Sequence, residues 1–432
     1  MRIVMIGTGY VGLVSGACFS EFGLTVICAD IDEDKISSLE HGEIPFYEPG
    51  LREKVTRGVA EGRLFFTTDV GDAIRSSDVV FIAVGTPANR DGTPNLDAID
   101  AVSHEIGRSL NGYKVIVTKS TVPPRTGERI RAIVAEEAGS DASFDIVSNP
   151  EFLREGSAIE DFLRPDRIVI GAESEKAVEL MRRLYGPLYL IETPFIVTDV
   201  ATAEMIKYSS NAFLATKISF INEVANICEL VGADVHVVVR AMGLDGRISP
   251  KFLHPGPGFG GSCFPKDVSA LVASAEAAGY EFQIGRAVTS VNERQRELMV
   301  EKIRAAVGDL QGKQIGILGL SFKPNTDDMR DSPSIEIVRG LQAQGAAVKA
   351  YDPAAMENAR RILEDVEFCE NSYEVADGAD ALVLMTEWNQ FRNLDFEQLK
   401  SSLRAPIVID LRNIYDPARM REMGFEYYPL GR

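Results

Sequence analysis

A glycine-rich segment near the middle of the chain holds the residues best suited to covalent chemistry. Residues 255–267 read PGPGFGGSCFPKD, and Cys263 comes directly before a predicted helix over 265–278 that Pro265 can open. The N–H groups and the dipole at a helix N-terminus favour an anion, so the thiol is expected to ionise readily and to act as a nucleophile. The glycines allow the backbone to approach a bound ligand closely.

Two pairs of polar residues are spaced for a shared helix face. Lys207 and Asn211 are four residues apart, and together they can stabilise an oxyanion in a dry site. Glu151 and Glu155 are also four apart. If that stretch is helical, the two carboxylates share a face, and one of them is a candidate general base.

The first thirty residues predict a dinucleotide site. A strand over 2–6 is followed by GTGYVG at 7–12, a helix over 13–22 and a strand over 25–29 that closes on Asp30. A G-x-G-x-x-G sequence between a strand and a helix, with an acid about 20 residues on, is typical of dinucleotide binding. Gly7 and Gly9 permit the tight turn against a pyrophosphate. Asp30 is expected to accept hydrogen bonds from a ribose and to favour NAD over NADP.

Polar segments follow three further predicted strands. The strands cover 78–84, 114–118 and 144–147, and the segments after them begin GTP, STVP and NPEFLREG. Ligands of open α/β sheets bind at the carboxyl ends of the strands, so these segments are candidate walls of the site.

The pattern changes near residue 199 and again near 312. Asp199 can cap a long helix that runs to about 230, and a helix over 283–307 follows. From Gly312 onward the chain repeats the β-α-β order without the glycine fingerprint, which predicts a second Rossmann-like domain for another ligand. The expected strands and helix cover 313–319, 334–344, 347–351, 379–385 and 406–411.

The predicted fold class is therefore α/β, with two Rossmann-like doubly wound domains joined by a central long-helix region. The expected domains are an NAD-binding domain over 1–198, a central helical domain with the cysteine loop over 199–311, and a further ligand-binding domain over 312–432. The central helices are apolar enough to serve as a dimer interface.

Composition excludes several classes of function. The chain has 45 basic and 64 acidic residues, and its net charge of −19 argues against nucleic acid or an anionic membrane as a partner. Five scattered cysteines argue against a disulfide framework or a metal site, and none of the four histidines lies in an acid–base motif. With no long apolar run, and with Met1 leading straight into a strand, we expect a cytoplasmic protein.

A nucleophilic cysteine beside an NAD site has a specific chemical meaning. Hydride transfer from an alcohol needs no thiol, whereas oxidation of an aldehyde to an acid benefits from one, because a thiohemiacetal offers a hydride that can be removed. The resulting thioester then needs a water and a base. The combination predicts oxidation of an alcohol to an acid in two hydride transfers.

The whole chain resembles the bacterial type of the UDP-glucose 6-dehydrogenase family. The matching segments, in the family's order and spacing, are GTGYVG at 7–12, VGTP at 84–87, STVP at 120–123, NPEFLREG at 149–156, AEMIKYSSNAFLATKISFINE at 203–223, GGSCFPKD at 260–267 and FKPNTDDMRDSPS at 322–334. The resemblance implies UDP-glucose as the substrate, UDP-glucuronate as the product and NAD as the cofactor.

The resemblance also implies roles for individual residues. Cys263 would be the covalent nucleophile, Lys207 and Asn211 would stabilise the oxyanion, and Asp267 would assist Lys207. Glu151, with Thr121 nearby, would activate the hydrolytic water. The residues implied in NAD binding are Gly7, Gly9, Tyr10, Val11, Gly12, Asp30, Lys35, Thr86, Thr121, Glu155, Lys266 and Arg330.

The residues implied in substrate binding surround the same segments. They are Glu151, Phe152, Leu153, Glu155, Lys207, Asn211, Arg247, Phe252, Phe259, Gly260, Phe264, Phe322, Lys323 and Arg412. Among them, Arg247 resembles an arginine that crosses from a partner subunit, so the resemblance implies a homodimer or a higher homo-oligomer. His254 departs from the family pattern, because some relatives have lysine at this position and others have various residues.

Three alternatives stay open at this stage. A sister enzyme would act on GDP-mannose or UDP-N-acetylmannosamine, but relatives of those types read SCLPKD or HCIPVD, whereas Ser262 and Phe264 fit the glucose enzyme. A two-electron hydroxyacid dehydrogenase would lack the cysteine loop and the second Rossmann-like domain. A catalytically inactive NAD-binding scaffold would be expected to lack Cys263, Lys207 or Asp267.

Overall fold

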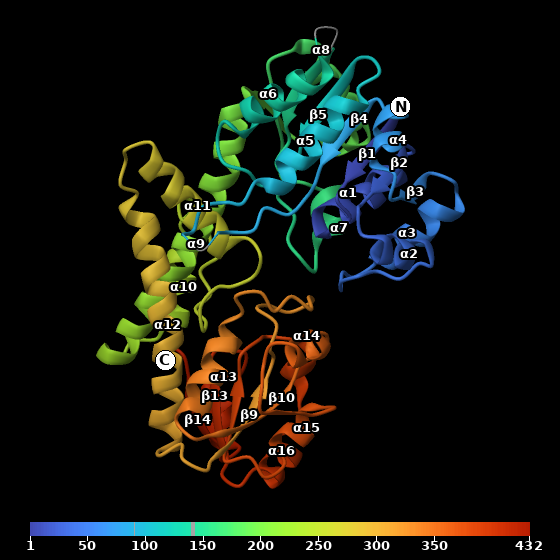
Figure 1. Ribbon diagram of the computed structural model, residues 1–432. Helices are drawn as coiled ribbons and strands as arrows, with labels where there is room; N and C mark the ends of the chain where they lie inside the picture. Colours follow the sequence, from blue (N-terminus) through green and yellow to red (C-terminus); the bar gives the residue numbers. More distant parts are fainter. Residues whose placement is uncertain (90, 140–142) are drawn as a thin grey trace. The chain divides into compact units, whose positions relative to one another are not determined.

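A computed structural model describes residues 1–89, 91–139 and 143–432. The chain forms two compact units (Figure 1). One comprises Met1–Ser210 with Ala273–Tyr280, and the other comprises Asn211–Val272 with Glu281–Arg432. Each unit is built on one mainly parallel sheet.

The first unit contains an eight-stranded sheet in the order β3-β2-β1-β4-β5-β6-β7-β8. Neighbouring strands are parallel except β6 and β7, which are antiparallel. The first six strands have the doubly wound order of a dinucleotide-binding sheet, which confirms the predicted fold class for this part. The strands are β1 (Arg2–Ile6), β2 (Thr25–Ala29), β3 (Leu64–Thr67), β4 (Val79–Ile82), β5 (Lys114–Thr118), β6 (Phe144–Ser148), β7 (Ile168–Ala172) and β8 (Phe195–Thr198).

Both faces of this sheet are buried. In β1, Ile3 and Met5 join the hydrophobic cluster on one face, while Val4 and Ile6 join the cluster on the other. This alternation explains why the strands read as continuous apolar runs. The helices of the unit are α1 (Tyr10–Glu21), α2 (Glu33–Glu40), α3 (Leu51–Ala60), α4 (Val70–Arg75), α5 (Asp97–Ser109), α6 (Thr126–Ala138), α7 (Ala158–Leu163), α8 (Glu175–Leu184) and the 3-10 helix η1 (Gly186–Ile191).

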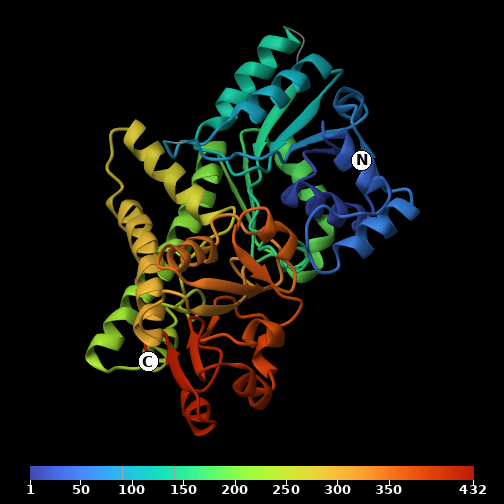
Figure 2. The ribbon, with the colours of Figure 1, turned by 60° about the horizontal axis from the view of Figure 1, so that its bottom comes forward.

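The second unit contains a six-stranded parallel sheet in the order β11-β10-β9-β12-β13-β14, seen in orange and red in Figure 2. This is the same strand order as in the first six strands of the chain, and it confirms the predicted second Rossmann-like sheet. Its elements are β9 (Gln314–Leu318), α13 (Pro333–Ala343), β10 (Ala347–Tyr351), α14 (Met356–Arg360), β11 (Val366–Phe368), α15 (Ser372–Ala376), β12 (Ala381–Leu384), η2 (Asn389–Asn393), α16 (Phe396–Ser402), β13 (Ile407–Asp410), α17 (Pro417–Glu422) and β14 (Glu426–Pro429).

Four helices lie between the two sheets in the chain order: α9 (Val200–Val231), α10 (Val235–Gly243), α11 (Phe264–Ala277) and α12 (Gln283–Val307). The predicted cap of α9 is present, because Asp199 accepts a hydrogen bond from the N–H of Thr202 at 2.8 Å. The helix predicted over 265–278 begins one residue earlier, at Phe264. The carbonyl of Cys263 accepts the N–H of Asp267 at 2.8 Å, so Cys263 itself starts the first turn.

The N-terminal helix also begins earlier than predicted. The expectation was a helix over 13–22, whereas α1 covers Tyr10–Glu21, because Gly12 lies within its first turn rather than in the loop before it. The predicted division into three domains stays a prediction. Within the part of the chain that the structure describes, no helix combines the length and apolar character needed to cross a bilayer, and no group of three potential metal ligands gathers.

Candidate active site

The loop before α1 has the shape that a pyrophosphate needs. A Cβ atom at Gly12 would overlap the carbonyl oxygen of Gly7, whereas the space around Gly9 is open. Gly9 precedes the helix and has no side chain to cap it, so the first-turn N–H groups can receive an anion. The Tyr10 hydroxyl donates to Glu48 and accepts the N–H of Gly156, and the predicted role of Tyr10 in NAD binding stays a prediction.

Asp30 stands at the end of β2 as the sequence predicts. It accepts the N–H of Thr8 at 2.8 Å and the Thr8 hydroxyl at 2.7 Å, and the ammonium of Lys35 lies 3.1 Å away. Burial acts to raise the pKa of Asp30, but these hydrogen bonds outweigh it and lower the pKa below its usual value. The residues present therefore fit NAD: an ionised acceptor for a ribose, with Lys35 beside it.

The second sheet uses its corresponding carboxylate differently. Asp352 ends β10 as Asp30 ends β2, but it is only 1% exposed. One of its oxygens accepts the N–H groups of Leu320 and Ser321, the Ser321 hydroxyl and the indole N–H of Trp388, and the other accepts two further backbone N–H groups. This carboxylate holds its own loop and is enclosed, whereas Asp30 is only half-buried.

Two of the predicted walls lie against each other. The hydroxyl of Thr86, after β4, donates to the carbonyl of Thr121, after β5, at 2.8 Å. The hydroxyl of Ser120 donates to the carbonyl of Val84 at 2.7 Å, so the two loops are tied at a second point. These bonds place Thr121 and Thr86 together at the carboxyl edge of the sheet, where the sequence predicts the site.

Glu151 and Lys207 form a buried ion pair in the first unit. The ammonium of Lys207 on α9 donates to Glu151 Oε1 at 2.9 Å, and the two side chains are 5% and 4% exposed. Glu151 Oε2 accepts the N–H of Leu153 at 2.5 Å. Each carboxylate oxygen can accept more than one hydrogen bond, so Glu151 keeps capacity for a water, and its predicted role as a base stays a prediction. The Lys207 ammonium also lies 5.5 Å from the ring centre of Phe152.

The expectation that Glu151 and Glu155 share a helix face is wrong. Residues 149–154 form no helix, and the first helix after them is α7, which begins at Ala158. The proline at 150 and the hydrogen bond between the Glu151 carboxylate and the Leu153 N–H hold this segment in a turn-like path. Glu151 is buried and Glu155 is partly exposed, so the two carboxylates have different surroundings.

A second buried carboxylate, Glu204, lies one turn before Lys207 on α9. Its two oxygens accept the backbone N–H groups of Arg125 at 2.6 Å and Gly127 at 2.9 Å, at the start of α6. It therefore caps the helix that follows the Thr121 loop. Burial raises the pKa of Glu204 to about 7, although these backbone hydrogen bonds act to lower it. Sequence patterns gave no sign of this cap, because the donor and acceptor are far apart in the chain.

This cap predicts a pH-dependent stability. The Glu204 carboxyl loses its proton near pH 4.5 in the unfolded chain but near pH 7 in the folded one, so the folded state loses stability as the pH rises between those values, by at most about 3 kcal/mol. The apparent melting temperature should therefore fall from pH 5 to 8 in the wild type relative to Glu204→Gln. Glu136→Gln, exposed further along α6, is the control and should keep the wild-type trend. If the melting temperature changes with pH in the same way in the wild type and in Glu204→Gln, the raised pKa of Glu204 is contradicted.

In the second unit, Asn211 and the cysteine loop share a polar centre. Asn211 Nδ2 donates to Asp267 Oδ2 at 2.6 Å, and the Lys266 ammonium lies 2.5 Å from Asp267 Oδ1. Asp267 is 0% exposed. The five cysteines, all within the described residues, form no disulfide, and Cys263 is half-buried whereas the other four are buried. Asp267 thus orients the amide of Asn211, and its predicted action on Lys207 stays a prediction.

The glycine loop is held by amide and guanidinium groups that the sequence analysis missed. Asn292 on α12 pairs with the backbone of Phe259, accepting its N–H at 2.8 Å and donating to its carbonyl at 3.0 Å. Arg296 donates to the same carbonyl at 2.9 Å, and Gln295 donates to the carbonyl of Gly256, also at 2.9 Å. Polar residues at 292, 295 and 296 recur at helical spacing on the buried side of α12. This spacing was the one feature of the sequence that could have predicted their contacts with the loop.

The loop also lies close to the segment after β9. A Cβ atom at Gly260 would overlap the backbone of Asp331, and one at Gly261 would overlap the Phe322 ring. The Phe264 ring centre lies 6.0 Å from that of Phe259 and 6.1 Å from that of Phe252. Four of the five aromatic residues predicted to contact the substrate therefore gather around this loop, all except Phe152, and only glycine fits at 260.

Four predicted basic residues have protein partners in the second unit. Arg412 donates to the carbonyls of Met385 and Phe322 at 2.7 and 3.2 Å, and a Cβ at Gly256 would lie 2.7 Å from its guanidinium. Arg330 pairs with Asp328, and the Lys323 ammonium lies 5.3 Å from the Phe322 ring centre. Arg247 is 90% exposed beside Asp245. Their predicted contacts with substrate, cofactor or a partner subunit stay predictions.

Two doubly wound sheets, one with a dinucleotide loop and one with an enclosed carboxylate, together with a half-buried cysteine, define a nucleotide-dependent dehydrogenase. The chain belongs to the UDP-glucose/GDP-mannose dehydrogenase family. Residues 1–189 match the model of its NAD binding domain, 201–294 that of its central domain and 316–417 that of its UDP binding domain.

Individual relatives agree along the whole chain. A UDP-glucose 6-dehydrogenase of Rhizobium meliloti (strain 1021) is 53% identical over 436 residues, covering 100% of both chains. The solved structure of a UDP-glucose dehydrogenase from the archaeon Pyrobaculum islandicum has a TM-score of 0.93 and 40% identity, covering 100% of this chain and 97% of that one. A UDP-D-ManNAc dehydrogenase from Pyrococcus horikoshii has a TM-score of 0.87 and 28% identity, covering 100% and 99%.

Proposed function

We propose that the protein oxidises C6 of UDP-glucose to the carboxylic acid, giving UDP-glucuronate and converting two NAD⁺ to two NADH. The observation that carries this proposal is Cys263 at the start of α11. It is the one half-buried cysteine of the five, it follows the clamped glycine loop, and Asp267 four residues on orients the amide of Asn211. The full-length similarity to UDP-glucose 6-dehydrogenases supports the choice of substrate.

The proposed mechanism uses the residues of the dinucleotide loop and the residues that act with Cys263. NAD⁺, when bound at the Gly7–Gly12 loop and Asp30, accepts the hydride of each oxidation. The Cys263 thiolate adds to the C6 aldehyde, and a proton neutralises the oxygen, giving a thiohemiacetal. Loss of a hydride and a proton gives the thioester. The buried cation of Lys207 and the amide of Asn211 stabilise the negative charge that develops on the C6 oxygen.

Hydrolysis completes the reaction. Glu151 takes a proton from water as the water oxygen attacks the thioester carbonyl, and the carbon–sulfur bond breaks to release the acid and the thiolate. Thr121, tied to Thr86 at the sheet edge, is placed to help hold this water. Lys35 and the backbone of Tyr10 and Val11 are assigned to NAD, as are Glu155, Lys266 and Arg330. The substrate assignments of Phe152, Leu153, Phe259, Phe322, Lys323 and Arg412 belong to the same proposal.

The proposal also covers the roles of the domains, the oligomeric state and the location of the protein in the cell. We assign NAD binding to 1–198, the cysteine loop and the dimer interface to 199–311, and UDP-sugar binding to 312–432. Large apolar side chains are exposed along α9, including Phe213 at 65% and Leu230 at 86%, and a second copy of the chain would cover them and bring Arg247 to its site. We place the protein in the cytoplasm, where nucleotide sugars and NAD are available together.

The test is the amount of NADH formed per UDP-glucose consumed, with NAD⁺ in excess. Two NADH with UDP-glucose alone, and none with UDP-galactose, GDP-mannose or UDP-N-acetylmannosamine, is the expected result. One NADH would mean that oxidation stops at the aldehyde and would remove the role given to Cys263. Turnover of a different sugar nucleotide alone would assign the chain to a sister branch of the family.

A further inference from the structure

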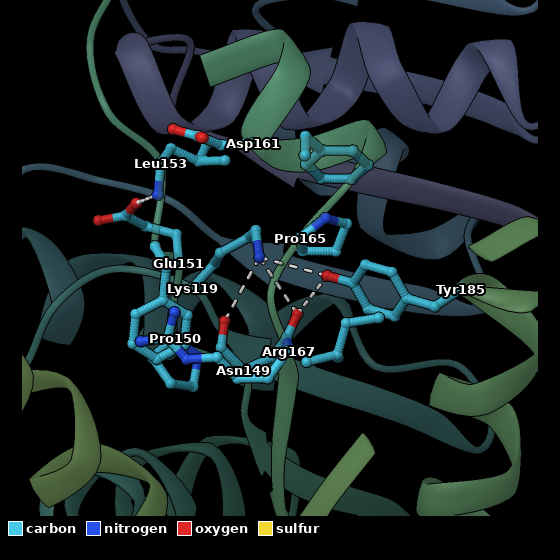
Figure 3. Close-up of a pocket in the computed structure, with 12 residues that line it drawn as sticks. Lys119, Asn149, Pro150, Glu151, Leu153, Asp161, Pro165, Arg167 and Tyr185 are labelled. Atoms are coloured by element: carbon cyan, nitrogen blue, oxygen red, sulfur yellow. Dashed lines mark hydrogen bonds between the residues drawn. The ribbon is translucent and has the colours of Figure 1, made fainter. Parts of the chain in front are cut away.

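A buried lysine that no step above uses lies behind the Glu151 loop. Lys119 follows β5 and is 3% exposed. Its ammonium lies 3.2 Å from Asn149 Oδ1, 3.5 Å from the Asn149 carbonyl and 3.3 Å from the Tyr185 hydroxyl (Figure 3). The Tyr185 hydroxyl in turn donates to Asn149 Oδ1 at 2.6 Å. The cluster thus centres on Asn149, two residues before Glu151.

The hydrogen-bond partners of Lys119 carry no charge. Its three acceptors are neutral oxygens at 3.2 to 3.5 Å, which together use the three N–H groups of an ammonium. Burying an ammonium without an adjacent carboxylate partner destabilises a fold. Burial accordingly lowers the pKa of Lys119 to about 8, with Lys207 lowering it further and Glu151 acting to raise it. An uncharged side chain would fill the same space with less cost to stability.

The residues around Lys119 indicate which group its positive charge acts on. Lys119, Glu151, Arg167, Asp161 and Tyr185 line one cavity of about 40 Å³ in the first unit, seen in Figure 3. Arg167 stacks on Phe152 at 3.5 Å from the ring centre and also interacts electrostatically with Glu151, whereas Asp161 pairs with Arg154. Lys207 donates to the Glu151 carboxylate. The Lys119 charge therefore adds to that of Lys207 at the carboxylate assigned as the base.

We propose that Lys119 is a positioning residue for Glu151, fixing Asn149 behind the loop and adding its positive charge to those of Lys207 and Arg167 near the carboxylate. The inference rests on the proposed function, because Glu151 is assigned there as the base of thioester hydrolysis. A positive charge near Glu151 keeps its carboxylate ionised before it takes the proton of the attacking water. Loss of that charge would disfavour the carboxylate relative to the carboxylic acid, and only the carboxylate can take the proton.

The test is the pH dependence of kcat with UDP-glucose and NAD⁺ for the wild type and three variants. Lys119→Met keeps the length and removes the charge, and should move the acid limb of the profile upward by about one pH unit. Lys119→Arg keeps the charge, and the neighbouring cavity has room for the larger head group. It should keep the wild-type acid limb and move the alkaline limb to higher pH. Tyr185→Phe removes a hydrogen-bond partner but no charge, and should leave both limbs in place.

The outcomes separate the two proposals. A wild type that forms no NADH from UDP-glucose rejects the proposed function itself. If the wild type is active and Lys119→Met lowers kcat by the same factor at every pH, without moving the acid limb, the positioning role is overturned. Lys119 is then a structural residue. If Lys119→Met does not fold, Lys119→Arg decides, because an alkaline limb identical to that of the wild type would also overturn the role.

Discussion

Replacing Cys263 by alanine is expected to abolish net formation of the acid and to lower kcat by about 1,000-fold or more. The first hydride transfer, from alcohol to aldehyde, does not need the sulfur. The second does, because the aldehyde must first become a thiohemiacetal. Cys263 begins α11, and its loop is held by Asn292 and Arg296, so alanine removes the nucleophile from a backbone that stays in place. The measurement is the UDP-glucuronate formed, with NADH per active site followed in parallel.

A buried cysteine of the same unit supplies the matched control. Cys369 is 6% exposed within the core of the C-terminal sheet, and burial raises the pKa of its thiol. Cys369→Ala should keep the wild-type kcat. Iodoacetamide should modify Cys263 faster than the other cysteines, and UDP-glucose should protect it. Wild-type acid formation by Cys263→Ala would exclude covalent catalysis by this residue, whatever the labelling shows.

The sheets and the long helices were predictable because their signals are local. β1, β2, β5 and β10 cover the residues that the apolar runs predict, since strands of a sheet buried on both faces consist mostly of apolar residues. The bounds of α12 match the periodic pattern. The antiparallel step from β6 to β7 and the edge strand β8 were not predicted, because the pairing of a strand depends on distant residues.

The candidate site was predictable as residue types but not as contacts. The residues that carry reactive groups lie in motifs, and so Cys263, Lys207 and Glu151 stand out in the sequence. The groups that hold these reactive residues in place do not stand out in the sequence. Asn292, Glu204 and Lys119 act through hydrogen bonds to backbone atoms or amides far away in the chain. The helical interpretation of 151–155 failed for a related reason. A spacing of four is informative only where the backbone is helical, and a proline at 150 with a local turn overrides it.

Glu151→Gln is expected to stop the reaction at a later step than Cys263→Ala does. The amide cannot take a proton from water, so hydrolysis of the thioester should slow by about 100- to 10,000-fold while both hydride transfers continue. The protein should then release two NADH per active site in a burst and accumulate a covalent adduct on Cys263. Intact mass of the quenched protein and the amplitude of the burst measure the two consequences separately.

The surroundings of Glu151 add a structural expectation and define the control. One carboxylate oxygen accepts the Lys207 ammonium and the other accepts the N–H of Leu153, so in glutamine the amide NH₂ must face one of these donors. Because Lys207 is only 4% exposed, loss of its counter-charge should lower the free energy of unfolding by about 3 kcal/mol. Kinetics are therefore measured well below the melting temperature of the variant. Glu160→Gln, exposed on α7 beside Arg164, should show neither adduct nor burst. A slower Glu151→Gln enzyme without an adduct would mean that Glu151 acts before the thioester forms, because a base needed only for hydrolysis must leave the acyl group on the sulfur.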